Sequence, residues 1–188
     1  MLPMSFFWQA ILVEGGLAVV AILVAFCFGL NYGAYLWCDG DTFRLIAWAM
    51  LPLVAGYFVL QALPFASLRR IDRFVRDVFW QHMGHLTLGQ LALIAALAGL
   101  GEELFFRGMI QLGLLATFGS QWLAVFLTSL LFGLAHAITP TYCFLAFLIS
   151  LYLGFLFMQT GNLLVPIVVH ALYDFFVFLF IRLTPQKN

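Results

Sequence analysis

The sequence predicts an all-α fold, a polytopic membrane bundle of about six transmembrane helices and one amphipathic interfacial helix. Of its 188 residues, 65% are hydrophobic and only 9% are charged, and the mean hydropathy is +1.09. Soluble domains carry much more charge, and one spanning helix needs about 20 mostly apolar residues. Residues 1–188 are therefore expected to form a single membrane domain with no separate soluble part. The formal net charge of zero gives no indication of a nucleic-acid partner.

Six apolar runs, separated by glycine, proline, asparagine or charged residues, are the predicted spans. They cover residues 6–30, 43–63, 88–118, 122–138, 142–158 and 163–183. The third run is longer than a bilayer is thick, so we expect it to tilt or to begin at the membrane surface.

Residues 67–80 are predicted to form the amphipathic helix, because their apolar residues recur at spacings of three and four. With six spans, the four arginines of this segment lie on the same side of the membrane as Arg182 and Lys187. The opposite side offers only Arg44, beside two aspartates. The positive-inside rule then predicts that both termini are cytoplasmic.

Several ionisable residues lie inside the apolar runs, where a charge costs about 2.5–3.5 kcal/mol on insertion scales. A single one is readily explained as an ion-paired or capped core residue, and Glu14 in the first run is interpreted as a packing or cytoplasm-proximal residue. A group of them indicates a functional site. The residues concerned are Glu14, Glu102, Glu103, Arg107, His136, His170 and Asp174.

The segment Gly101–Arg107 contains two glutamates with different surroundings. Glu103 and Arg107 are four residues apart, so they share one helix face and are expected to form an ion pair. Glu102 lies about 100° around the helix from its neighbour and has no obvious partner. An unpaired carboxylate in an apolar pocket is suited to accept a proton from water.

Two further pairs have the same spacing of four, Phe132 with His136 and His170 with Asp174. A lone buried histidine is more often a core residue than a ligand or a base. Together with Glu102, however, the two histidines supply the groups of a hydrolytic site.

The three patterns EExxxR, FxxxH and HxxxD, in this order on successive apolar runs, resemble the CAAX-protease and bacteriocin-processing (Abi) family of glutamic intramembrane endopeptidases. That family's last pattern is HxxxN or HxxxD. The resemblance covers about residues 88–183, which we expect to be the catalytic core, and leaves the first two spans unmatched.

The resemblance implies a role for each motif residue. Glu102 and His136 activate the attacking water, His170 and Asp174 face the developing oxyanion, and Glu103 and Arg107 hold the geometry. Many relatives have asparagine where this chain has Asp174. We expect this carboxylate to orient His170 through the ring N–H; the alternative is that it is protonated and donates a hydrogen bond.

The resemblance further implies a peptidase for a membrane-anchored or lipidated protein, cutting near its C-terminal tail, with no cofactor and no metal. The compact chain is most similar to bacterial members that process C-terminal sorting signals, which predicts the bacterial inner membrane as its location.

Three alternatives stay open from the sequence. Two glutamates and two histidines could bind zinc, although no HExxH motif is present. The polar cluster could instead hold helices together in a non-enzymatic immunity or scaffold protein. A transporter or proton pathway is the third alternative, and Glu14 is its main support.

Overall fold

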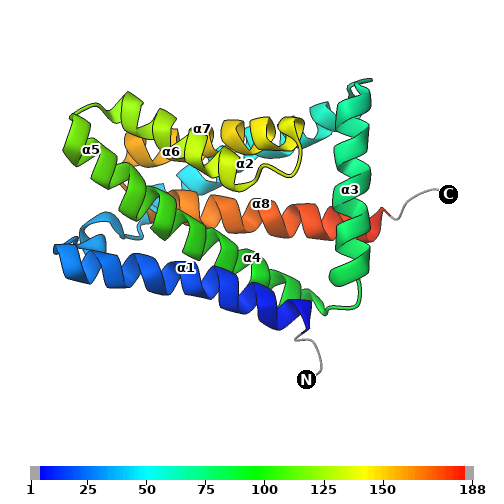
Figure 1. The fold of residues 1–188 in the computed structure, drawn as a ribbon, viewed down its shortest axis with the longest axis horizontal. Helices are drawn as coiled ribbons and strands as arrows, with labels where there is room; N and C mark the ends of the chain where they lie inside the picture. The colour runs from blue at the N-terminus through cyan, green and yellow to red at the C-terminus, as the bar shows by residue number, and fades with distance from the viewer. Residues whose placement is uncertain (1–4, 185–188) are drawn as a thin grey trace.

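The computed structural model describes residues 5–184, and every regular element in that range is a helix (Figure 1). This confirms the predicted all-α bundle. Five of these helices are long and apolar enough to cross a membrane. They are α1 (Phe6–Phe28), α2 (Gly40–Ala62), the continuous helix Leu88–Phe118, α7 (Pro140–Thr160) and α8 (Leu164–Leu183).

The fourth predicted span is shorter than expected. Helix α6 (Gln121–Ala135) has 15 residues, about 22 Å of helix, against a hydrocarbon core of about 30 Å. Pro140 begins the next helix, and a proline disfavours helical geometry at the residue before it. Pro140 therefore disfavours helical geometry only at Thr139, whereas α6 already ends at Ala135, and the chain turns from His136 on instead of continuing to residue 138.

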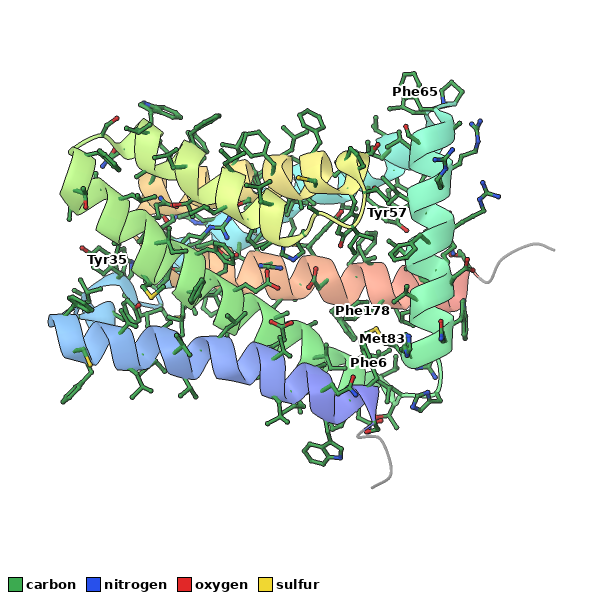
Figure 2. All side chains as sticks on the ribbon, viewed as in Figure 1. Phe6, Tyr35, Tyr57, Phe65, Met83 and Phe178 are labelled. Carbon is green, nitrogen blue, oxygen red and sulfur yellow. The ribbon has the colours of Figure 1, made fainter. Side chains whose placement is uncertain are left out.

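The predicted amphipathic segment is helix α3 (Ala66–His82), which lies across one end of the bundle, nearly at right angles to the other helices (Figure 1). Arg76 fixes it there, since this side chain is buried, pairs with Asp72 at 3.0 Å and donates to the main-chain oxygen of Thr184 at 2.6 Å. Figure 2 shows Phe6, Met83 and Phe178 close together at this junction.

The two ends of the described chain lie at the same end of the bundle, as an even number of membrane crossings requires. The start of α1, the end of α8 and helix α3 lie at the same end of the bundle (Figure 1). The short helix η1 (Tyr32–Tyr35) lies at the opposite end, between α1 and α2.

Helix α4 (Leu88–Glu103) packs tightly between α1 and α8 because two glycines remove its side-chain bulk. A methyl group at Gly101 would overlap the main-chain oxygen of Glu14 in α1. At Gly99 it would lie 2.6 Å from the main-chain oxygen of Ile167 and 2.8 Å from the main-chain nitrogen of Ala171, both in α8. The two neighbouring helices therefore approach α4 just before its two glutamates.

Candidate active site

The two glutamates stand where the long central helix changes its geometry. Helix α4 ends at Glu103, and the following residues Leu104–Gln111 form the π-helix η2, after which α5 (Leu112–Phe118) continues the span. A π-helical turn accommodates more residues than an α-helical turn and changes where side chains point, which is why such segments are frequent at functional sites. Arg107 lies inside this segment.

The expected ion pair between Glu103 and Arg107 is present. Nη1 of Arg107 donates to Oε1 of Glu103 at 2.9 Å, and both side chains are completely buried. Nη2 of Arg107 donates to the main-chain oxygen and to Oγ of Ser150 in α7, at 2.8 and 2.9 Å. The guanidinium also lies 5.3 Å from the ring centre of Phe132 in α6, a cation–π distance. Arg107 thus joins three helices.

Glu103 also holds His170, which corrects an expectation from the sequence. Nδ1 of His170 lies 2.8 Å from Oε1 of Glu103, so the carboxylate that orients this ring is Glu103 and not Asp174. Asp174 lies on the other side of the ring, with Oδ2 at 3.6 Å from Nε2, beyond direct hydrogen bonding. The reason is that the spacing of four brings Asp174 to the Nε2 edge, while α4 occupies the Nδ1 edge.

Glu102 lies between the two histidines. Its Oε1 is 3.9 Å from Nε2 of His136, and its Oε2 is 4.0 Å from Nε2 of His170. These distances are too long for direct hydrogen bonds, but one water molecule can bridge such a separation. Three segments far apart in the sequence therefore direct one carboxylate and two imidazole nitrogens at a common point.

The orientation of His136 follows from the early end of α6. His136 is the residue after the last helical position, and its Nδ1 lies 2.8 Å from the main-chain oxygen of Phe132, on whose ring it stacks at 4.3 Å between centroids. A carbonyl oxygen can only accept, so Nδ1 carries the proton. In the neutral ring, Nε2 is then an unprotonated acceptor facing Glu102.

The side chains fall into a sealed layer and an accessible layer. Glu103 and Arg107 have exposed fractions of 0%, whereas Glu102, His136 and Asp174 retain 12%, 28% and 30%. The buried pair can therefore set the geometry, and His136 and Asp174 can meet water and a substrate. Oε2 of Glu102 is itself buried and has no hydrogen-bond partner among the described residues.

A groove lies at the α3 end of the bundle. It has a volume of about 380 Å³ and lies between α3 and the connection from α6 to α7. Arg70 and Phe74 line it on one side, and Ile138 and Tyr142 on the other. The ring of Tyr142 lies 6.5 Å from that of His136, so this tyrosine belongs to both the groove and the site.

All six residues predicted for the site lie in this one cluster, together with residues that the sequence reasoning did not assign to it. Ser150 and Tyr142 come from α7 and carry no local signal that would distinguish them from other polar residues of an apolar helix. Glu14 was interpreted as a packing residue, and its main chain does pack on Gly101, beside Glu102, while its Oε2 is buried without a hydrogen-bond partner among the described residues. Its charge inside an apolar run was the feature of the sequence that could have assigned it to the site.

A metal site is not evident from the donor geometry. Within residues 5–184, no group of three or more histidine, cysteine, aspartate or glutamate side chains is arranged to hold a metal ion.

Comparison with known proteins agrees with the motif assignment. Residues 84–176 match the model of one family, described as type II CAAX prenyl endopeptidase Rce1-like. No curated protein and no solved structure matched the chain. The matched segment includes α4, η2, α6 and α7 and the part of α8 that carries His170 and Asp174. Residues 84–176 of this integral membrane protein therefore belong to the Rce1-like family, a group of membrane endopeptidases within the CAAX-protease and bacteriocin-processing family.

Proposed function

We propose that this protein is a glutamic-type intramembrane endopeptidase that cuts a membrane-anchored or lipidated protein near its C-terminal tail. The observation that carries the proposal is the position of Glu102, a carboxylate 3.9 and 4.0 Å from two imidazole nitrogens inside an apolar bundle. Catalytic bases are held within reach of the proton they abstract, directly or through one water. The catalytic core is proposed to comprise residues 88–183.

In the proposed mechanism, Glu102 and Nε2 of His136 accept the two hydrogen bonds of one water molecule. As the water oxygen attacks the scissile carbonyl carbon, Glu102 takes one of its protons. Collapse of the tetrahedral intermediate breaks the C–N bond, and Glu102 returns the proton to the leaving amine. A positioned base of this kind contributes about 10²–10⁴-fold to the rate.

His170 and Asp174 are proposed to stabilise the oxyanion. Nδ1 of His170 donates to Glu103, so Nε2 can donate to the oxyanion only when the ring is an imidazolium. The carboxylates on its two sides, Glu103 and Asp174, favour that charged form. An oxyanion donor of this type contributes about 2.7–4 kcal/mol to transition-state stabilisation.

The substrate is proposed to enter from the α3 end, through the groove between α3 and the α6–α7 connection. Tyr142 lines this groove, and its ring lies 6.5 Å from that of His136. The walls are mostly apolar, which suits an extended segment of a membrane-bound polypeptide. We propose that this end faces the cytoplasm of a bacterium, with the protein in the inner membrane and both termini cytoplasmic.

The test is cleavage of a candidate tail peptide by the purified protein in liposomes. Glu102→Gln and His136→Ala are expected to lower the turnover by at least about 10²-fold. Wild-type cleavage by both variants would contradict the mechanism. A scaffold or immunity role instead predicts that Glu102→Gln leaves the biological activity intact although no peptide is cleaved. Asp174→Asn tests whether Asp174 donates to the oxyanion or acts as a negative charge beside His170. An amide donates a hydrogen bond without needing a proton, so improved turnover would identify Asp174 as a donor.

A chelator distinguishes the zinc alternative. The proposed mechanism predicts that turnover survives dialysis against a strong zinc chelator. Loss of turnover that added zinc restores would assign the same residues to a metalloprotease.

A further inference from the structure

Glu14 lies in the middle of α1, a helix that is outside the segment matched by the family model. Its main-chain oxygen contacts Gly101, the residue immediately before Glu102. The preceding residues Leu12 and Val13 are 61% and 60% exposed on the outer surface of the bundle. Glu14 is partly buried on the inner side of the same helix, so its carboxylate is directed into the protein and not towards lipid.

The carboxylate of Glu14 has an unmet polar requirement. Its Oε2 is buried and has no hydrogen-bond partner within residues 5–184. Burying a carboxylate oxygen without a partner is costly. Simple packing between α1 and α4 would be served better by an apolar residue or by an amide, so the position calls for another explanation.

The charged groups around Glu14 are those of the proposed active site. Gly101, which touches Glu14, directly precedes Glu102 in α4, and Gly99 of the same helix touches Ala171 of α8, about one turn before Asp174. Arg107 of η2, which also packs on α1, is turned to Ser150 in α7. His82 of α3 contacts α1 at Phe6, about two turns from Glu14. Tyr32 of η1 reaches α1 only at the main-chain oxygen of Ala21, about two turns away.

We infer that Glu14 is a positioning residue of this site, whose negative charge sets the pH range in which Glu102 ionises and can act as a base. Carboxylates that lie close together bind and release protons as a group. Each negative charge makes the next ionisation harder, so removal of one carboxylate lets the others ionise at lower pH. The relevance to catalysis rests on the proposed function, whereas the coupling between the carboxylates does not.

The coupling can be measured without a substrate by infrared titration of the reconstituted protein. The C=O stretch of a protonated carboxyl group disappears on ionisation, and the band that Glu102→Gln removes identifies Glu102. Glu14→Gln keeps the shape of the side chain and removes its charge. We expect it to move the Glu102 titration midpoint to lower pH by about one unit, and the acid limb of the cleavage rate to move with it.

Two further variants separate charge from packing. Glu14→Asp keeps the charge and should titrate close to wild type, and Glu14→Ala should shift the midpoint as Glu14→Gln does, which preserves the test if one variant folds poorly. Asp41→Asn is the matched control, because Asp41 is an exposed carboxylate near the start of α2 whose loss should leave the midpoint unchanged.

The outcomes are distinguishable. An unchanged midpoint in folded Glu14→Gln or Glu14→Ala overturns the inference, as does an equal shift in the Asp41→Asn control. If Glu102→Gln cleaves substrate like wild type, the proposed function fails, while the infrared result for Glu14 still decides the coupling.

Discussion

The replacement Arg107→Met would remove the guanidinium from the centre of the bundle and leave an apolar side chain in its place. In the structure, Arg107 and Glu103 are completely buried, and Arg107 makes three hydrogen bonds, one to Glu103 and two to Ser150. The variant therefore leaves a buried carboxylate without its cation and two serine oxygens without their donor.

The expected loss follows from burial and from the remaining partner. Breaking a buried ion pair from one side costs about 3–5 kcal/mol. His170 stays 2.8 Å from Glu103 and compensates part of the charge, so we expect the lower end of that range, about 3 kcal/mol. The exposed pair Arg44–Asp41 is the control, where Arg44→Met should cost about 1 kcal/mol or less.

The assay is reversible unfolding of the purified protein in mixed micelles with increasing denaturing detergent, followed by circular dichroism. The double variant Arg107→Met/Glu103→Gln should recover part of the loss, because it no longer buries an uncompensated charge. If Arg107→Met is no less stable than Arg44→Met, or if the double variant is less stable than the single one, the role assigned to this pair is wrong.

The remaining predictions concern packing and topology. Gly101→Ala should lower the unfolding free energy by about 1–3 kcal/mol and reduce cleavage, because its methyl group overlaps the α1 backbone. The control is Gly113→Ala, whose methyl group meets nothing within 4 Å and should have neither effect. Equal effects of the two variants would contradict the close contact at Gly101. A membrane-impermeant thiol reagent should label Cys38, in the exposed connection between η1 and α2, from outside intact cells. A cysteine placed at Arg69 of α3 in a cysteine-free background should react only after permeabilisation, and the reverse pattern would overturn the proposed orientation.

Much of the fold could be predicted from local sequence. Runs of about 20 apolar residues identify spans, and the spacing of residues 67–80 identifies an amphipathic helix. The shortness of α6 could not be read in the same way, because residues 136–139 are as apolar as a span end. Pro140 restricts the residue before it and so indicates that a new helix begins there, but it does not locate the end of α6.

The site was predictable where it depends on contacts within one helix. The Glu103–Arg107 pair follows from a spacing of four. Contacts between helices depend on their relative rotation and depth, which no periodicity records. For this reason Asp174, and not Glu103, was expected to orient His170, and the contact of Arg107 with Ser150 was not foreseen.

For Glu14, too, the contacts between helices could not be predicted from the sequence. Its charge within an apolar run marked it as unusual, but the residue that it contacts, Gly101 beside Glu102, lies in α4, far along the chain. The small residue that allows this approach, Gly101, is one of 16 glycines in the sequence. Only the packing of α1 on α4 distinguishes it from the others.

The central claim, that Glu102 activates water for direct attack on the peptide bond, is tested most directly by a single turnover in water enriched in heavy oxygen. Mass spectrometry of the products and of the protein then locates the label. We expect one heavy oxygen atom in the new carboxyl group of the cleaved substrate, none in Glu102, and no cleavage above background by Glu102→Gln. Label in the Glu102 side chain, or an undiminished rate in Glu102→Gln, would contradict the account.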